Sequence, residues 1–249
     1  MPKALEGLTA VVTGASSGIG EATALALAKE GAKVALLARR KDRLDQLAKR
    51  IASHDGHSIS LECDVCDPEQ ARQAVQESDK RFGRLDILVN NAGLMLLGPV
   101  DGADLSDWRR MVDTNILGLM YCTHAALPLM KANKQGHIVN ISSVSGRIAS
   151  AGTAVYNATK WAVGAFSEAL RQEVHKDKIR VTIIEPGAVM TELTDHITNQ
   201  GAKQRVKDWV QTLQPLTATD IAEAILYAVS QPRHVNVNEI LIRPTDQLP

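Results

Sequence analysis

The fold of this 249-residue chain is decided by one short stretch, Thr13-Gly14-Ala15-Ser16-Ser17-Gly18-Ile19-Gly20. The stretch follows an apolar run at residues 10–13 and precedes an Ala-rich segment with helical spacing. Glycines at this place allow a sharp turn between a strand and a helix, and they let the helix pack closely on the strand. The stretch therefore predicts a strand–turn–helix unit, the first unit of an α/β fold.

The rest of the chain repeats this alternation of apolar runs and amphipathic segments. Strand-like runs lie at 10–13, 34–37, 58–63, 87–89, 137–141, 180–184 and 239–242. Helix-like segments lie between them, at 18–30, 41–53, 68–82, 106–130, 155–175 and 219–230. Because no linker or low-complexity tract divides the chain, we expect a single doubly wound α/β domain over residues 1–249. Its parallel sheet should have about seven strands, with helices on both faces.

The composition argues against several classes of protein. Hydrophobic residues make up 45% of the chain and charged residues 22%, and the formal net charge is zero. This balance favours a soluble globular protein without a nucleic-acid partner. The sequence shows neither a signal-peptide pattern nor a run of about 18 apolar residues. We therefore expect a cytoplasmic protein with no membrane partner.

The cysteines and histidines do not indicate a metal or redox site. The three cysteines are Cys63, Cys66 and Cys122, an odd number that fits a reducing compartment. Cys63 and Cys66 form a C-x-x-C, but the chain has no second pair, and the motif ends an apolar run instead of opening a helix. The seven histidines lack ligand spacing. We expect no metal.

The glycine-rich stretch also predicts a dinucleotide site. The first turn of a helix presents free N–H groups and a positive dipole end, which bind pyrophosphate. The second strand then ends in Ala38-Arg39-Arg40, where many NAD enzymes carry a ribose-binding acid. Guanidinium groups pair with phosphate through bidentate contacts, so this place favours NADP(H) over NAD(H). Arg39 is the first candidate for the 2′-phosphate and Arg40 the second; the alternative is a solvated pair that caps the next helix.

Three residues in the second half of the chain indicate proton-transfer chemistry. Ser143 follows the strand-like run 137–141, and Tyr156 and Lys160 stand four residues apart at the start of a helix. This spacing places both side chains on one helix face. A neighbouring ammonium lowers the pKa of a tyrosine from its usual value of about 10, so Tyr156 could exchange a proton with a carbonyl or alcohol oxygen. Ser143 could orient and polarise that oxygen.

The glycine turn, Asn90-Asn91-Ala92-Gly93, Asn115, Ser143 and Tyr156-x-x-x-Lys160 occur in one order along the chain. Together they closely resemble the short-chain dehydrogenase/reductase family across essentially all 249 residues. The resemblance implies a Rossmann fold and a role for Asn115 in a proton relay through a water next to Lys160. Without the resemblance, Asn115 could equally mark a local helix kink, since asparagine is mildly unfavourable within helices.

The resemblance also implies a set of cofactor contacts. Asp64 and Val65 would hold the adenine, Asn91 the ribose, and Thr191 the nicotinamide carboxamide, while Asn90 would brace the sheet. The full set of expected cofactor-binding residues is Gly14, Ser16, Ser17, Gly18, Ile19, Gly20, Arg39, Arg40, Asp64, Val65, Asn91, Ala92, Gly93, Tyr156, Lys160, Pro186, Gly187, Val189 and Thr191.

The function that the resemblance implies is an NADP(H)-dependent oxidoreductase that acts on CH–OH donors, interconverting an aldehyde or ketone and an alcohol. Residues 94–100, 113–119, 185–196 and 242–246 look like the branch of clavulanate-dehydrogenase-like proteins and aldehyde/ketone (carbonyl) reductases. One alternative is a 3-oxoacyl-carrier-protein reductase, which would need a basic docking patch. A second is a non-catalytic dinucleotide sensor, which the intact pair of Tyr156 and Lys160 disfavours.

The sequence says less about the residues that bind the substrate than about those that bind the cofactor. Residues 187–215 interrupt the strand–helix rhythm and predict a substrate lid or, alternatively, a solvated surface excursion. An apolar site should favour hydrophobic aldehydes or ketones, with Arg147 the nearest basic group. The residues expected to border the carbonyl site are Met95, Leu96, Val144, Ser145, Val189, Met190 and Leu193.

The helix-like segment 155–175 carries more apolar surface than one sheet-facing stripe needs. Its small side chains would allow close approach of a second helix across a symmetric interface. We therefore expect a homo-oligomer, and the family resemblance implies a homotetramer. The apolar residues of this segment are Ala158, Ala162, Val163, Ala165, Phe166, Ala169 and Leu170.

Overall fold

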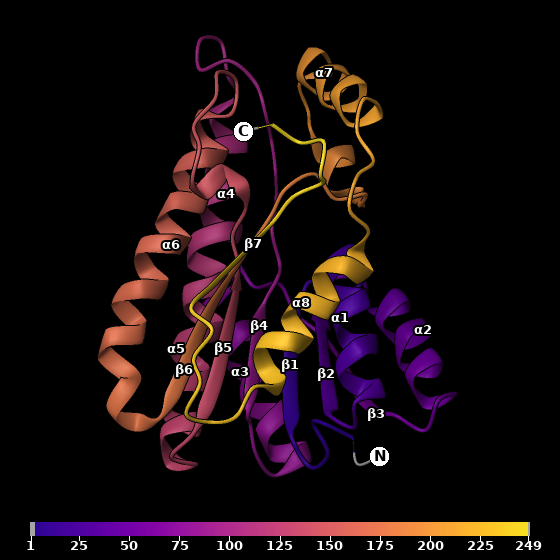
Figure 1. The fold of residues 1–249 in the computed structure, drawn as a ribbon, viewed down its shortest axis with the longest axis vertical. Coiled ribbons are helices and arrows are strands. Elements are labelled where there is room, and N and C mark those ends of the chain that lie inside the picture. Colours follow the sequence, from indigo (N-terminus) through magenta and orange to yellow (C-terminus); the bar gives the residue numbers. More distant parts are fainter. Residues whose placement is uncertain (1–2, 249) are drawn as a thin grey trace.

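The computed structural model describes residues 3–248, and its centre is one seven-stranded sheet (Figure 1). The strand order is β3-β2-β1-β4-β5-β6-β7, and every neighbouring pair is parallel. This confirms the predicted doubly wound α/β fold. The strands are β1 (Thr9–Thr13), β2 (Lys33–Ala38), β3 (His57–Glu62), β4 (Ile87–Asn90), β5 (Gly136–Ile141), β6 (Ile179–Pro186) and β7 (Glu239–Ile242).

Helices cover both faces of the sheet. One core cluster joins the strands to α1, α2 and α8, and a second joins them to α3, α5 and α6. Alternate residues of β1 enter alternate clusters, Ala10 and Val12 the first and Val11 the second, as the pleat of a strand requires. The helices are α1 (Gly18–Lys29), α2 (Lys41–Ala52), α3 (Pro68–Phe82), α4 (Leu105–Val112), α5 (Leu119–Ala132), α6 (Ala154–Val174), α7 (Gln200–Gln211) and α8 (Ala218–Ser230).

The strand order places a ligand crevice at a defined position. The chain leaves β1 toward β2 and β3 on one side, and it returns to β4 on the other. The connections after β1 and β4 therefore diverge at the carboxyl ends of these strands, which is where open α/β sheets bind ligands. The lid segment, with η4 (Glu192–His196) and α7, and the last described residues before 249 lie at this same end, at the top of Figure 1.

The predicted helical segment 106–130 is confirmed as one helical run from Leu105 to Ala132, but its middle is not α-helical. Between α4 and α5 the residues Asp113–Gly118 form a π-helix, η1. A π-turn inserts an extra residue into the helical repeat, and such turns are frequent at functional sites. Asn115 lies in this turn and is buried, so the local irregularity and the site position coincide. Within the described residues, no helix has both the length and the apolarity needed to cross a bilayer.

Candidate active site

A cavity of about 850 Å³ opens at the carboxyl ends of the strands. The glycine turn forms one side of it, together with the segment Asn91–Gly93 after β4. Ser143, Tyr156 and Lys160 line another side. The structure therefore brings the predicted cofactor residues except Gly20, and the predicted chemical residues except Asn115, into one space.

The glycine turn has no room for side chains. Gly14 and Gly18 have φ values of +64° and +56°, in the left-handed region. A Cβ atom on Gly20 would overlap the carbonyl oxygen of Gly14. Ser17 is the N-cap of α1 but makes no capping hydrogen bond through its side chain, so no side chain closes the start of this helix to an anion.

The two asparagines after β4 differ in their contacts. Asn90 Nδ2 donates to Thr123 Oγ1 at 2.9 Å and to Asn140 Oδ1 at 2.8 Å, which braces the sheet as expected. Asn91 Nδ2 donates to the carbonyl oxygens of Thr13 at 2.9 Å and Gly14 at 3.3 Å. Asn91 thus holds the glycine turn in place, and its expected contact with a ribose stays a prediction.

Arg40, not Arg39, is fixed over the glycine turn. Its Nη2 donates to Ser16 Oγ at 2.9 Å and to Ser17 Oγ at 2.7 Å, and its Nε donates to Ser16 Oγ at 3.1 Å. Arg39 also lines the cavity, but its side chain is exposed. Arg40 occupies the N-cap position of α2 without a capping hydrogen bond through its side chain. These contacts favour Arg40, whereas the sequence favoured Arg39, and which of the two holds a 2′-phosphate stays a prediction. The helix-capping alternative is not supported for Arg40.

Asp64 and Val65 line the cavity beyond the arginines, together with Cys63 and Cys66. Asp64 Oδ1 accepts from the backbone N–H of Cys66 at 3.0 Å. All three cysteines of the chain are free. Burial raises the pKa of the Cys63 thiol to about 12, which suits a core side chain rather than a reactive thiolate.

The catalytic candidates converge around the start of α6. Ser143 is the N-cap of the short helix η2 (Val144–Gly146), and its hydroxyl lies within hydrogen-bonding reach of Tyr156. Lys160 Nζ lies 5.8 Å from the centre of the Tyr156 ring and donates to the carbonyl oxygen of Ile141 at 2.9 Å. The side chains of Tyr156 and Lys160 are both buried.

Asn115 fixes the wall beside these residues. Its Oδ1 accepts from Leu94 N at 2.7 Å, and its Nδ2 donates to Leu94 O at 2.8 Å and to Thr159 Oγ1 at 3.1 Å. The amide therefore joins the chain after β4 to the helix that carries Tyr156 and Lys160. These contacts make Asn115 a positioning residue, while its part in a water relay stays a prediction.

The pKa expected for Tyr156 from the sequence is wrong in direction for this structure. Burial raises the pKa of Tyr156 to about 12, and the hydrogen bond with Ser143 offsets only part of this effect. Burial also lowers the pKa of Lys160 to about 8. Desolvation disfavours the charged form of each group, the phenolate of Tyr156 and the ammonium of Lys160. Tyr156 is therefore held as a protonated acid.

The substrate side of the cavity differs in part from the prediction. Leu96 packs in a buried cluster with Met111, and Met190 is 69% exposed, so neither lines this cavity. Arg147 donates to Glu185 at 2.7 and 2.8 Å and also pairs with Glu239, which commits it to β6 and β7. The predicted residues that do line the cavity are Met95, Val144, Ser145, Val189 and Leu193.

Residues of the lid and the tail complete this wall, and the sequence analysis missed them. From the lid these are His196, Val206, Trp209 and Val210. The spacing of the three from α7, i, i+3 and i+4, is the signal that could have shown a cavity-facing stripe. Gln247 and Leu248 come from the tail, where no sequence pattern marks them.

Gln247 joins the tail to the connection after β6. Its Oε1 accepts from Ala188 N at 2.8 Å, and its side chain is buried. A Cβ atom on Gly187 would overlap this oxygen, so glycine at 187 is what allows the tail to lie here. Gly187 and Gln247 are 60 positions apart in the sequence, so their contact becomes visible only in the folded chain.

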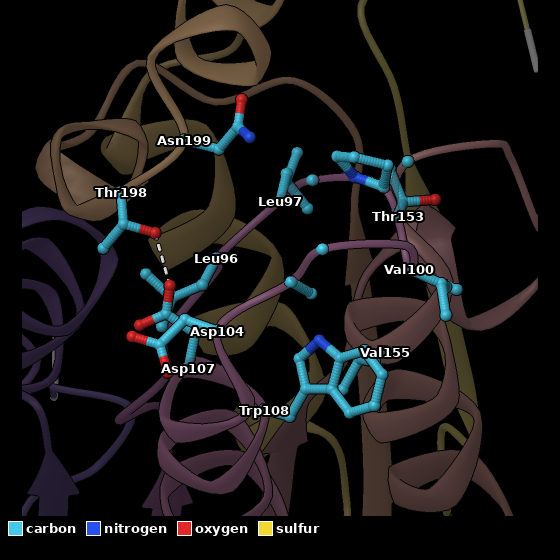
Figure 2. A pocket seen from close by; sticks show the side chains of 16 residues that line it. Leu96, Leu97, Val100, Asp104, Asp107, Trp108, Thr153, Val155, Thr198 and Asn199 are labelled. Atoms are coloured by element: carbon cyan, nitrogen blue, oxygen red, sulfur yellow. Dashed lines mark hydrogen bonds between the residues drawn. The ribbon is translucent and has the colours of Figure 1, made fainter.

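A second, smaller pocket of about 270 Å³ lies beside the cavity (Figure 2). Leu97 and Thr153 line both spaces. At one edge of the pocket, Thr198 of the lid donates a hydrogen bond to the carboxylate of Asp107 on α4, drawn as a dashed line in Figure 2. This contact holds the middle of the lid segment against α4.

The chain was compared with known proteins. Residues 8–202 match the family model described as short chain dehydrogenase. An uncharacterized oxidoreductase of Staphylococcus saprophyticus is 44% identical over 240 residues, which cover 95% of this chain and 96% of that protein. An uncharacterized oxidoreductase of Staphylococcus aureus is 41% identical over 235 residues, covering 94% and 96%.

Solved structures agree with these relatives. The closed form of a serine dehydrogenase complexed with NADP+ superposes with a TM-score of 0.90 at 36% identity and covers 97% of both chains. An alcohol dehydrogenase from the archaeon Thermococcus sibiricus, complexed with 5-hydroxy-NADP, has a TM-score of 0.87 at 29% identity and covers 97% of this chain and 98% of that one. The expected family is confirmed: this chain is an oxidoreductase that belongs to the short-chain dehydrogenase/reductase family.

Proposed function

We propose that this protein is an NADP(H)-dependent oxidoreductase that interconverts an aldehyde or ketone and the corresponding alcohol. One observation carries the proposal: Ser143, Tyr156 and Lys160 line the same cavity as the glycine turn. Carbonyl reduction by a dinucleotide requires a proton donor and a phosphate-binding turn that face the same cavity. Two similar structures contain NADP or a derivative of it, which supports this cofactor.

The residues present fit a nicotinamide dinucleotide. The turn at Gly14–Gly20 forms a cradle that side chains would fill, and the start of α1 has no capping side chain. Arg40 and Arg39 would hold a 2′-phosphate together with Ser16 and Ser17. When bound, the cofactor supplies or accepts the hydride.

The chain's own residues supply the proton. Burial keeps Tyr156 protonated, so its Oη is a proton donor to a carbonyl oxygen in the reductive direction. Ser143 lines the same cavity, and its Oγ would orient that oxygen. Because burial lowers the pKa of Lys160 to about 8, its ammonium can give up a proton near neutral pH and restore the acid after each turnover.

The lid and tail give the substrate site its apolar character. Met95, Leu193, Val206, Trp209 and Val210 line this part of the cavity, and Arg147 is turned to Glu185 and Glu239. This wall supports hydrophobic aldehydes or ketones as substrates. We propose residues 187–215 as the substrate lid of a single domain.

The test is a panel assay of NADPH and NADH oxidation. Hydrophobic aldehydes and ketones should be reduced with a higher kcat/KM than small charged keto acids. An acyl-carrier thioester belongs in the panel, because preferential turnover of it would favour the carrier-protein reductase instead. The absence of turnover with every carbonyl compound would favour a dinucleotide sensor.

Tyr156→Phe is the matched inactive variant for this assay. It removes only the hydroxyl group, so turnover should fall by about 10²- to 10⁴-fold, the usual range for general acid catalysis. NADPH binding, measured by fluorescence titration, should stay within about threefold of the wild type because the ring is retained. Near-normal turnover would refute the role of Tyr156.

We further propose a cytoplasmic homotetramer. The outer face of α6 exposes Ala158, Trp161, Ala165 and Ala169, a stripe that could pack against a second copy. Light scattering at micromolar concentration should give the mass of four chains, and a monomeric mass would refute the assembly.

A further inference from the structure

Glu192, the first residue of η4, connects the lid to the phosphate end of the cavity. Its carboxylate accepts from Arg40 Nη1 at 2.9 Å and from Arg43 Nη1 at 2.7 and 2.9 Å. Thr191, the preceding residue, lies against the glycine turn, because a Cβ atom on Gly18 would be 3.2 Å from Thr191 Cγ2. The proposed function uses neither Glu192 nor Arg43.

Arg40 is shared between two sets of partners. Its Nε and Nη2 groups face the hydroxyls of Ser16 and Ser17, and its Nη1 group faces Glu192. These contacts use four of the five N–H groups of the guanidinium, so a 2′-phosphate that binds Arg40 through two N–H groups has to displace a serine hydroxyl or the carboxylate from at least one of them. The hydroxyls are neutral and can themselves donate to a phosphate, whereas the carboxylate repels it.

We propose that Glu192 is a cofactor-discriminating residue that competes with the 2′-phosphate of NADP(H) for Arg40. On binding of the phosphate, Arg40 exchanges the Glu192 carboxylate for the phosphate, and Arg43 keeps the carboxylate. The inference rests on the proposed NADP(H) dependence and deepens it, because it makes the lid part of the phosphate site.

The electrostatics support a competition between two anions. Hydrogen bonds from Arg40 and Arg43 lower the pKa of Glu192 to about 2, so this carboxylate is charged throughout the physiological range. Arg43 contacts both carboxylate oxygens, so Glu192 stays paired after Arg40 leaves. The side chains of this ion-pair group are 39–43% exposed, which screens the repulsion and keeps the expected effect moderate.

The exchange has a consequence for the lid. Two side-chain contacts tie the lid to helices beside it: Glu192 on Arg40 and Arg43, and Thr198 on Asp107 (Figure 2). Loss of the contact with Arg40 changes only the first of these contacts. A ligand with a 2′-phosphate should therefore alter amide exchange in residues 188–196, while a ligand without this phosphate should not.

The test is a calorimetric titration of the wild type and Glu192→Gln with 2′,5′-ADP and with 5′-ADP. The substitution keeps the shape of the side chain and removes its charge. The variant should bind 2′,5′-ADP about two- to tenfold more tightly, and its affinity for 5′-ADP should be unchanged within about twofold. Glu69→Gln is the matched control, because Glu69 also pairs with an arginine, Arg72, but on α3 away from the cavity.

The outcomes separate this inference from the proposed cofactor. If Glu192→Gln binds 2′,5′-ADP as the wild type does, or more weakly, then Glu192 does not compete and the inference is overturned, although the NADP(H) dependence stands. If the wild type itself binds the two nucleotides equally, the NADP(H) dependence fails and this inference fails with it. A tighter 2′,5′-ADP complex in the Glu69→Gln control would also overturn it, because the effect would then be one of net charge.

Discussion

Two walls of the cavity are held together by different kinds of interaction. The glycine wall, residues 13–20 and 90–93, is fixed by backbone geometry and by buried hydrogen bonds, such as those from Asn90 to Thr123 and Asn140. The lid wall, residues 188–212 and 243–248, rests on a small apolar cluster with Ile197 and Ala202 and on a few polar contacts with distant elements. Elements with few buried contacts open most readily, so we expect the lid wall to move and the glycine wall to stay.

Lys160, which we propose to take part in proton transfer with Tyr156, is a buried group of the same cavity. Lys160 is buried, and no carboxylate pairs with it among the described residues. By contrast, Arg147 nearby is paired with Glu185 and Glu239. A buried unpaired ammonium destabilises a fold, so its presence is better explained by function than by stability.

Lys160→Met should therefore have the largest effect: it should lower the activity of the enzyme and raise the stability of the fold. The value of kcat/KM should fall by at least about 100-fold, because the proton relay is lost. The free energy of unfolding at pH 7 should rise by about 1–3 kcal/mol, because a charged group no longer has to be buried. Denaturant titrations measure the second effect, and Lys176→Met, at an exposed site, is the control.

The pH dependence gives the sign of this effect. Burial lowers the pKa of Lys160 from 10.5 to about 8, so between these values the unfolded chain binds more protons than the folded one. The stability contributed by this group therefore rises with pH from about 8 to 10.5 in the wild type. The advantage of Lys160→Met should be full below pH 8 and shrink above it. A constant advantage would contradict the buried ammonium.

Arg40→Asp and Arg39→Asp compare the two candidates for the 2′-phosphate. Because Arg40 is the one fixed on Ser16 and Ser17, its substitution should weaken NADPH binding by about 10- to 100-fold, the range of a lost charge-assisted contact. NADH binding should change by less than about threefold. Arg39→Asp should show a smaller loss for NADPH. The reverse ranking, in titrations with both cofactors, would restore the order expected from the sequence.

The glycine wall was predictable from the sequence because its parts are local. Parallel strands are buried on both faces and appear as apolar runs, and the glycine turn lies within eight residues. The pair of Tyr156 and Lys160, outside this wall, is equally local. For the lid wall, the sequence predicted the position of the lid segment along the chain but not its contacts. Glu192 on Arg40 and Gln247 on Ala188 join residues more than 50 positions apart, and no single sequence pattern encodes such a contact.

Two errors inside the predictable part have physical causes. The π-turn at Asp113–Gly118 differs from an α-helix by one residue in the repeat, which a stretch of six residues does not reveal. The pKa of Tyr156 was predicted from its neighbour Lys160 alone. In the structure, burial sets the pKa values of Tyr156 and Lys160, and burial depends on the whole fold.

Gly187→Ala tests the contact between the tail and the site. The added Cβ atom would overlap Gln247 Oε1, so the variant should lose about 1–3 kcal/mol of stability and bind substrate several-fold more weakly. Gln247→Ala alone should cost about 1–2 kcal/mol, because Ala188 N loses its acceptor. The double variant should be more stable than the sum of the two losses predicts. Strict additivity in denaturant titrations would show that the tail does not press on Gly187.

Thr198→Val should have the smallest effect on stability. It tests whether the lid wall is held as weakly as its few contacts indicate. The change keeps the shape of the side chain and removes the hydroxyl that donates to Asp107. Asp107 keeps Arg110 at 3.0 Å, and the apolar cluster around Ile197 is untouched, so stability should fall by no more than about 1 kcal/mol.

The effect should instead appear as local motion. Amide exchange in residues 196–212 should become up to about fivefold faster, the equivalent of one lost hydrogen bond, while residues 13–20 keep their protection. Thr212→Val is the matched control, because the hydroxyl of Thr212, at the carboxyl end of α7, donates only to Trp209 O. A loss of protection that spread from the lid to the glycine turn would mean that the two walls unfold as one unit, and the contrast between them would not hold.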